Sequence, residues 1–186
     1  MGIEHDRTGI ARSARRPGEE HCQRPGTAHG GPDDALQPPF ENGGAIPTAN
    51  AATAAGDNLS PALNWDDVPK GTEQLLLIIE DVDVPLPRPL IHTVALFSPA
   101  MTRLAEGALV SGNEHIWFPR LGFGRSGYAG PRPIPGHGPH HYGFHLYALD
   151  LAIPASTEVK GVKGVLPAVN GHVLAAAHLT GTHEQA

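Results

Sequence analysis

Glycine and proline interrupt this chain so often that little of it could form long helices. The sequence has 23 Gly and 19 Pro among its 186 residues, and both residue types disfavour helix interiors. The strongest apolar runs are short, and no helical pattern separates them, so parallel strands joined by crossover helices are disfavoured. The sequence therefore predicts a mostly β fold, built as an antiparallel sandwich.

Three short segments carry the pattern of strands. The continuous apolar run at 75–79 is typical of a central strand that is covered on both faces, and 91–97 and 143–149 follow as two further strands. Helical signals gather at the C-terminal end. Pro167 suits a first helical turn, Val169, Val173 and Ala177 follow at helical spacing, and Gly181 could end the helix.

The first part of the chain differs in composition from the rest. Within residues 1–34 arginines alternate with acidic residues, and Ile3 and Ile10 are the only strongly apolar side chains. Such a segment buries too little surface to offset the entropy lost on ordering. We therefore expect a flexible N-terminal tail over 1–34 and a single domain over 35–186.

Charge and cysteine content narrow the functional classes. The net charge is -6 with His neutral, which argues against a nucleic-acid-binding protein because such proteins need a basic face. Cys22 is the single cysteine, so a disulfide framework within the chain is excluded. No apolar run reaches membrane-spanning length, and no secretory signal is recognisable. The default expectation is a cytoplasmic protein without stable membrane insertion, with a homodimer left open.

Two carboxylates directly follow the most apolar run. In an extended chain, residues two apart face the same side, so Asp81 and Asp83 are predicted to point together. Perturbed carboxylates of this kind often mark functional sites, although a solvated acidic turn is an equally good interpretation. His92 begins the next strand, which could pair with the first and bring His92 toward the two acids.

A loop rich in Gly and Pro covers 127–142 and leads into the third strand. His140 and Tyr142 alternate at its end, so they share one face, and both are good donors to a phosphate oxygen. A zinc site on His137, His140 and His141 is disfavoured because no further ligand has the usual spacing. The sequence 122–127 matches the dinucleotide pattern G-x-G-x-x-G but lacks the required strand before it and helix after it. We therefore predict neither a cofactor nor a metal.

Taken in order, these motifs resemble the phosphatidylethanolamine-binding protein family, most closely its bacterial Raf-kinase-inhibitor-like branch. The resemblance runs from about residue 36 to about residue 182 and rests on these segments: Asn58-Leu59-Ser60-Pro61-Ala62-Leu63-Asn64-Trp65, Asp81-x-Asp83-x-Pro85, His92, Gly130-Pro131 and Gly138-Pro139-His140-x-Tyr142. Three departures stand out. Val82 and Val84 stand where the family usually has Pro and Ala, His141 replaces the usual Arg, and Arg132 stands where bacterial members often have Cys.

The resemblance implies a fold and a site. The fold is an antiparallel Greek-key β-sandwich with a few peripheral helices and a C-terminal helix. The site is a small anion pocket, formed by the following residues: Asp81, Asp83, His92, His140 and Tyr142, with Gly130 and Pro131 in the loop that walls it.

Three functions fit these residues. The first is a small soluble binding or regulatory protein that captures an anionic ligand, either phosphate or a phosphoethanolamine-like head group. The second is an enzyme, an isomerase, dehydratase or hydrolase, that uses the His, Asp and Tyr side chains for acid–base chemistry. The third, which the family name suggests, is an inhibitor of a kinase or protease. We favour binding because no residue has the setting of an activated nucleophile.

Overall fold

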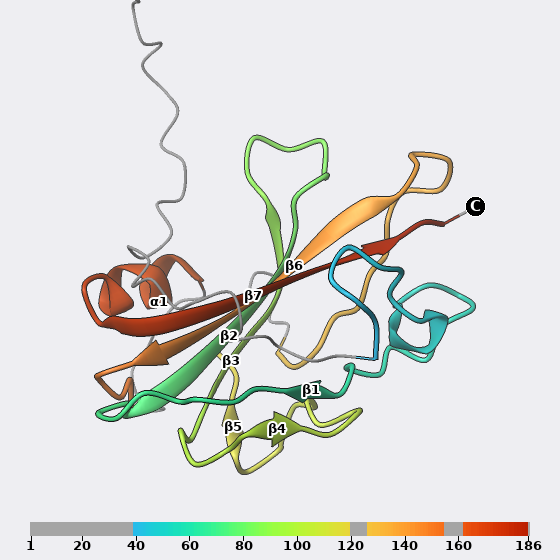
Figure 1. Cartoon of the computed structure of the whole chain (residues 1–186). Coiled ribbons are helices and arrows are strands. Elements are labelled where there is room, and N and C mark those ends of the chain that lie inside the picture. The colour runs from blue at the N-terminus through green and yellow to red at the C-terminus, as the bar shows by residue number, and fades with distance from the viewer. Residues whose placement is uncertain (1–38, 120–125, 155–161, 186) are drawn as a thin grey trace, which may run out of the picture.

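The computed structural model describes residues 39–119, 126–154 and 162–185. The tail predicted over 1–34 lies outside these residues. Within them the chain forms a five-stranded antiparallel sheet in the order β5-β3-β2-β6-β7, and β1 pairs with β4 in a two-stranded sheet (Figure 1). The elements, in chain order, are η1 (Thr48–Asn50), β1 (Leu63–Asn64), β2 (Gln74–Asp81), β3 (Leu90–Phe97), β4 (Arg103–Leu104), β5 (Ile116–Trp117), β6 (His140–Leu149), α1 (Val162–Val169) and β7 (Val173–His183).

The large sheet carries a hydrophobic core on each face. Leu77 of β2 and Phe144 of β6 belong to the core that also contains Trp65. Leu76 belongs to the second core, which is covered by Val165 of α1. Residues 75–79 are all buried, which confirms that the continuous apolar run is a central strand covered on both faces.

The predicted fold class is confirmed: the chain is mostly antiparallel β, with little helix and one short helix near the C-terminus. The predicted strands correspond to β2, β3 and β6. β6 begins at His140, three residues earlier than the pattern indicated, so His140 and Tyr142 lie in the strand itself.

The position of the C-terminal helix is corrected by the structure. The helix occupies Val162–Val169, with Pro167 inside it rather than in its first turn. Residues 173–183, which the spacing of Val173 and Ala177 predicted to be helical, form β7 at the edge of the sheet. Gly171, with φ of 84°, turns the chain between the two elements. Pairing along nearly the whole of β6 outweighs the helical preference of the alanines.

Candidate functional site

Four of the predicted site residues meet at one end of the large sheet. Asp81 is the last residue of β2 and lies opposite Tyr142 in β6, and Figure 1 shows the β2–β3 loop (light green) leaving the sheet at this end. His140 precedes Tyr142 by two residues on the same face, and His92 lies near the start of β3. We call Asp81, His92, His140 and Tyr142 the Asp81 cluster.

A β-bulge in β3 orients His92. Ile79 lies opposite Thr93 and Glu80 lies opposite Ile91, so His92 is an extra residue without a partner in the register. The His92 Nδ1–H donates to the carbonyl oxygen of Ala129 at 3.0 Å, and the Ala129 N–H donates to Thr93 Oγ1 at 3.3 Å. Both side chains therefore face the same loop, which is the re-aiming that bulges commonly provide near functional sites.

His140 is held by a buried carboxylate. Its Nδ1–H donates to Asp81 Oδ2 at 2.8 Å, and the two side chains are only 2% and 3% exposed. The other oxygen of Asp81 accepts the N–H of Asp83 at 3.0 Å. The Nε2 of His140 faces His137 Nδ1 at 3.2 Å. Because Asp81 binds Nδ1–H, a second proton on His140 would sit on Nε2, where it could be donated to a ligand.

Tyr142 contributes a buried hydroxyl. Its ring meets His92 edge-on with centroids 5.5 Å apart, and its oxygen forms no hydrogen bond of ordinary length to any described residue. Burial raises the pKa of Tyr142 well above its ordinary value, and the nearby Asp81 carboxylate raises it further. The hydroxyl is therefore a protonated donor that interacts with the Asp81 carboxylate and the Arg132 backbone without forming a hydrogen bond of ordinary geometry to either.

Asp83 does not share a face with Asp81, which corrects the sequence prediction. β2 ends at Asp81 and the chain bends at Val82, so the alternation of an extended strand stops there. Asp83 Oδ2 instead accepts the backbone N–H of His141 at 2.7 Å and its Nδ1–H at 2.6 Å. The two acids thus bind successive histidines of β6, one buried and one exposed.

The surroundings of Asp83 lower the pKa of its carboxyl group. Desolvation alone would raise the pKa of Asp83, but the hydrogen bonds and charge of His141 lower it, and the net result is a pKa below the ordinary 3.8. The carboxylate form is therefore favoured in the folded state.

Gly130 and Pro131 fix the loop beside His92. The Gly130 N–H donates to Asn58 Oδ1 at 2.8 Å, and the carbonyl oxygen of Pro131 accepts the N–H of Ala52 at 2.8 Å. A Cβ atom on Gly130 would come within 2.2 Å of the carbonyl oxygen of Asn50. Sequence reasoning gave no role to Asn50 or Asn58, although Asn58 opens the first motif of the resemblance.

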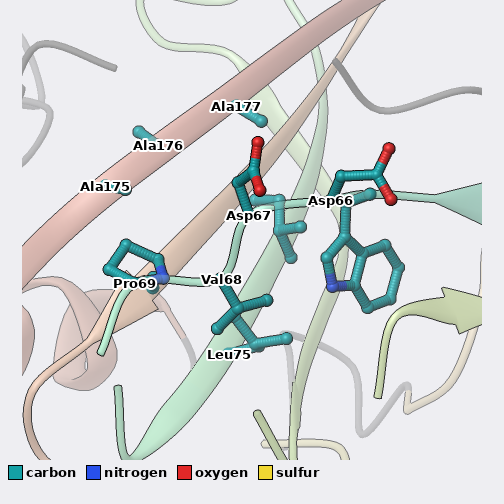
Figure 2. Close-up of a pocket in the computed structure, with 11 residues that line it drawn as sticks. Asp66, Asp67, Val68, Pro69, Leu75, Ala175, Ala176 and Ala177 are labelled. Carbon is teal, nitrogen blue, oxygen red and sulfur yellow. The ribbon is translucent and has the colours of Figure 1, made fainter. Parts of the chain in front are cut away.

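A pocket lined by Trp65, Leu75 and Ala176 lies away from the Asp81 cluster. Figure 2 shows it between the segment that carries Asp66 and Val68 and the alanines 175–177 of β7. None of the residues lining it belongs to the cluster, so an anion pocket at the cluster stays a prediction.

Two further findings concern metals and membranes. Over 39–119, 126–154 and 162–185, no group of three or more His, Cys, Asp or Glu side chains is placed to hold a metal ion. The same ranges contain no helix long and apolar enough to cross a bilayer.

Two predictions from the sequence are not tested by the structure. The G-x-G-x-x-G match falls largely on residues 120–125, outside the described chain. The cytoplasmic location predicted from the sequence stays a prediction.

Comparison with known proteins gives consistent matches. A family model described as "Phosphatidylethanolamine-binding protein" matches residues 37–184. A UPF0098 protein from Aquifex aeolicus is 36% identical over 151 residues, covering 78% of this chain and 85% of the relative.

Two solved structures have the same fold. A phosphatidylethanolamine-binding protein homolog, CT736 from Chlamydia trachomatis, is 32% identical with a TM-score of 0.68, covering 82% of this chain and 99% of that chain. YbcL from E. coli, described as a new member of the mammalian PEBP family, is 25% identical with a TM-score of 0.72, covering 83% and 99%. The matched span 37–184 contains every residue of the Asp81 cluster.

Proposed function

Because this chain belongs to the phosphatidylethanolamine-binding protein family, we propose that its Asp81 cluster binds a small anion. The proposed ligand carries a phosphate group, either as inorganic phosphate or as a phosphoethanolamine-like head group. Tyr142 and His140 donate to the phosphate oxygens, His92 lies beside Tyr142, and Gly130 and Pro131 hold the adjoining loop.

The observation that carries this proposal is the buried hydroxyl of Tyr142. Burying a polar group without a hydrogen bond is costly, so such groups in folded proteins call for an explanation. The raised pKa of Tyr142 keeps its proton in place. A buried donor next to an Asp–His pair suits an anionic oxygen, which makes stronger hydrogen bonds than a neutral acceptor.

His140 supplies the second donor. Asp81 fixes the orientation of its ring through Nδ1, and a protonated His140 would present Nε2–H toward His137. Because His137 is exposed, it can turn aside or donate to the same anion. The Asp81 carboxylate offsets the charge of a protonated His140, which reduces the cost of burying that charge.

Phosphate, rather than the ammonium group, is expected to dominate recognition. Asp81 already uses both of its oxygens for hydrogen bonds within the protein, and Asp83 is directed to His141. Neither carboxylate is left fully available for an ethanolamine ammonium. Inorganic phosphate and phosphoethanolamine should therefore bind with similar affinity.

Titration calorimetry with these two ligands tests the proposal through Tyr142→Phe. Loss of one hydrogen bond to a charged ligand should weaken binding by about ten-fold or more. The free energy of unfolding should change little, because the hydroxyl forms no hydrogen bond of good geometry in the protein. Tyr147→Phe is the matched control, since Tyr147 is buried on the other face of the same strand. Equal affinity in the Tyr142 and Tyr147 variants would refute the proposal.

One geometric feature also favours the enzyme alternative. The buried Asp81–His140 pair is an arrangement that acid–base enzymes use to orient an imidazole. Release of inorganic phosphate from phosphoethanolamine during the same titrations, abolished by His140→Ala, would indicate hydrolysis in addition to binding.

A further inference from the structure

A second polar cluster lies on the opposite face of the large sheet. It consists of Glu80 in β2, His145 in β6 and His178 in β7, and we call it the His145 cluster. Strand alternation separates it from the Asp81 cluster, because Ile79 and Phe144 belong to one hydrophobic core and Ile78 and Tyr147 to the other. The function proposed above uses none of these three residues.

His145 is held in one orientation. Its Nε2–H donates to Glu80 Oε1 at 3.1 Å, and its ring stacks on Tyr147 with an interplanar angle of 18°. Gly143 makes room for the ring, since a Cβ atom there would lie 2.6 Å from Nε2. The residue is 6% exposed. Because Nε2 carries the proton for Glu80, the lone pair of neutral His145 is on Nδ1.

His178 places a second imidazole nitrogen beside that lone pair. The two residues are directly opposite in the β6–β7 register, and their Nδ1 atoms are 2.8 Å apart. Thr180, two residues further on, makes its backbone bonds to the 42–43 segment rather than to β6. His145 and His178 are therefore a non-hydrogen-bonded pair, the type in which side chains approach most closely.

Two nitrogen atoms at this separation can hold one proton between them. A metal cation is the other species that can accept both lone pairs. Imidazole nitrogens suit Zn²⁺, Cu²⁺ and Ni²⁺, and a metal-binding histidine commonly donates its other N–H to a carboxylate, as His145 does to Glu80. With Zn–N bonds of 2.0–2.1 Å, tetrahedral geometry needs about 3.4 Å between the nitrogens. His178 is exposed and can make that small adjustment.

We propose that His145 and His178 bind a first-row transition-metal dication through their Nδ1 atoms, with Glu80 as the positioning residue. The site has two protein ligands, and water or a group from a binding partner completes the coordination. This agrees with the absence, among the described residues, of any metal-binding group with three or more side chains. Two ligands on a preorganised strand pair give moderate affinity.

Zinc titration of the full chain, in a buffer that does not chelate metals, tests the site. His178→Ala should weaken one zinc-binding event by at least ten-fold, and Glu80→Gln should weaken the same event by about ten-fold through loss of the outer carboxylate. His172→Ala is the matched control, because His172 is a similarly exposed histidine that pairs with Asp150. Histidines outside the described residues are common to all variants and cancel in the comparison.

The His137–His140 contact is the other place in the described chain where two histidine nitrogens lie close enough to explain zinc binding. Its nitrogens are 3.2 Å apart, so His137→Ala must leave the zinc event unchanged. With Cu²⁺, the paramagnetic resonance spectrum should indicate two coordinated imidazole nitrogens in the native chain and one in His178→Ala. Unchanged zinc affinity in His178→Ala, or loss of the event in His137→Ala, overturns the proposal. Circular dichroism checks that each variant is folded.

Discussion

Two Asp–His pairs lie next to each other at the end of the large sheet and differ mainly in burial. In Asp81–His140 the nitrogen and oxygen are 2.8 Å apart and the side chains are 3% and 2% exposed. In Asp83–His141 the distance is 2.6 Å, yet the side chains are 40% and 51% exposed. The nitrogen–oxygen distance is therefore a poor guide to how much each pair contributes to stability. Solvent screens the outer pair, whereas the inner pair has no water to replace a lost partner.

The residues on either side explain why one pair is buried. Tyr142, which lies opposite Asp81 in the register, packs edge-on against His92, and His92 in turn donates to Ala129 of the adjoining loop. The outer pair faces away from both cores, because His140 and His141 alternate along β6. The same two residue types thus form a fixed element of the candidate site on one face and a surface ion pair on the other.

Matched amide substitutions should separate the two pairs most strongly. Both oxygens of Asp81 accept hydrogen bonds in the native chain. Asp81→Asn keeps the shape of the side chain but replaces one of these oxygens by an amide NH2 group, which donates and cannot accept, so one of the two bonds is lost. The variant should lose about 3 kcal/mol of unfolding free energy, the scale for breaking a buried pair. In Asp83→Asn the amide oxygen can still accept both bonds from His141, so the loss should stay below about 1 kcal/mol.

Urea unfolding of both variants at neutral pH measures this difference. If Asp81→Asn costs no more than Asp83→Asn, burial is not what distinguishes the pairs, and the inner pair has no special place in the site.

Much of this arrangement could be predicted from the sequence, because the strands around it carry strong patterns. The apolar runs located β2, β3 and β6, and the motifs at their ends identified Asp81, His92, His140 and Tyr142. The orientation of Asp83 could not be predicted, since it depends on β2 ending at Asp81. The bulge at His92 leaves no mark in the residue types around it.

The remaining features could not be predicted because they depend on contacts between segments that are far apart in the sequence. Residues 175–177 are all Ala, a strong helix former, and nothing local indicates that they pair with β6. With β7 mistaken for a helix, His178 could not be matched with His145. Asn50 and Asn58 contact the loop from 78 and 72 residues away in sequence, a separation that local patterns do not encode.

A change behind the loop should have an intermediate effect and act on the His92 side of the Asp81 cluster. Gly130→Ala places a methyl group against the Asn50 carbonyl oxygen, 2.2 Å away in the unrelaxed structure. The loop must shift away, at a cost of about 1–3 kcal/mol for overpacking. Since Ala129 accepts the His92 bond, ligand affinity should fall as well.

Urea unfolding and phosphate calorimetry measure both effects of Gly130→Ala. Arg132→Ala, an exposed residue of the same loop, is the stability control and should cost little. A fully stable Gly130→Ala would mean that the loop does not pack closely enough to shield His92.

The smallest effect is the pH dependence of the outer pair. The pKa of Asp83 is lower in the folded chain than the ordinary 3.8, so the unfolded chain binds the proton more readily. The pair therefore stabilises the fold fully above about pH 3.8, and this contribution disappears as the pH falls through the lower folded-state value. The stability difference between the native chain and Asp83→Asn should stay below about 1 kcal/mol. This difference should shrink once the pH drops below 3.8, the pKa of the free carboxyl. Urea unfolding at a series of pH values measures the difference. A gap that widens in acid would mean that the folded state favours protonated Asp83, and that the outer pair is not an ion pair.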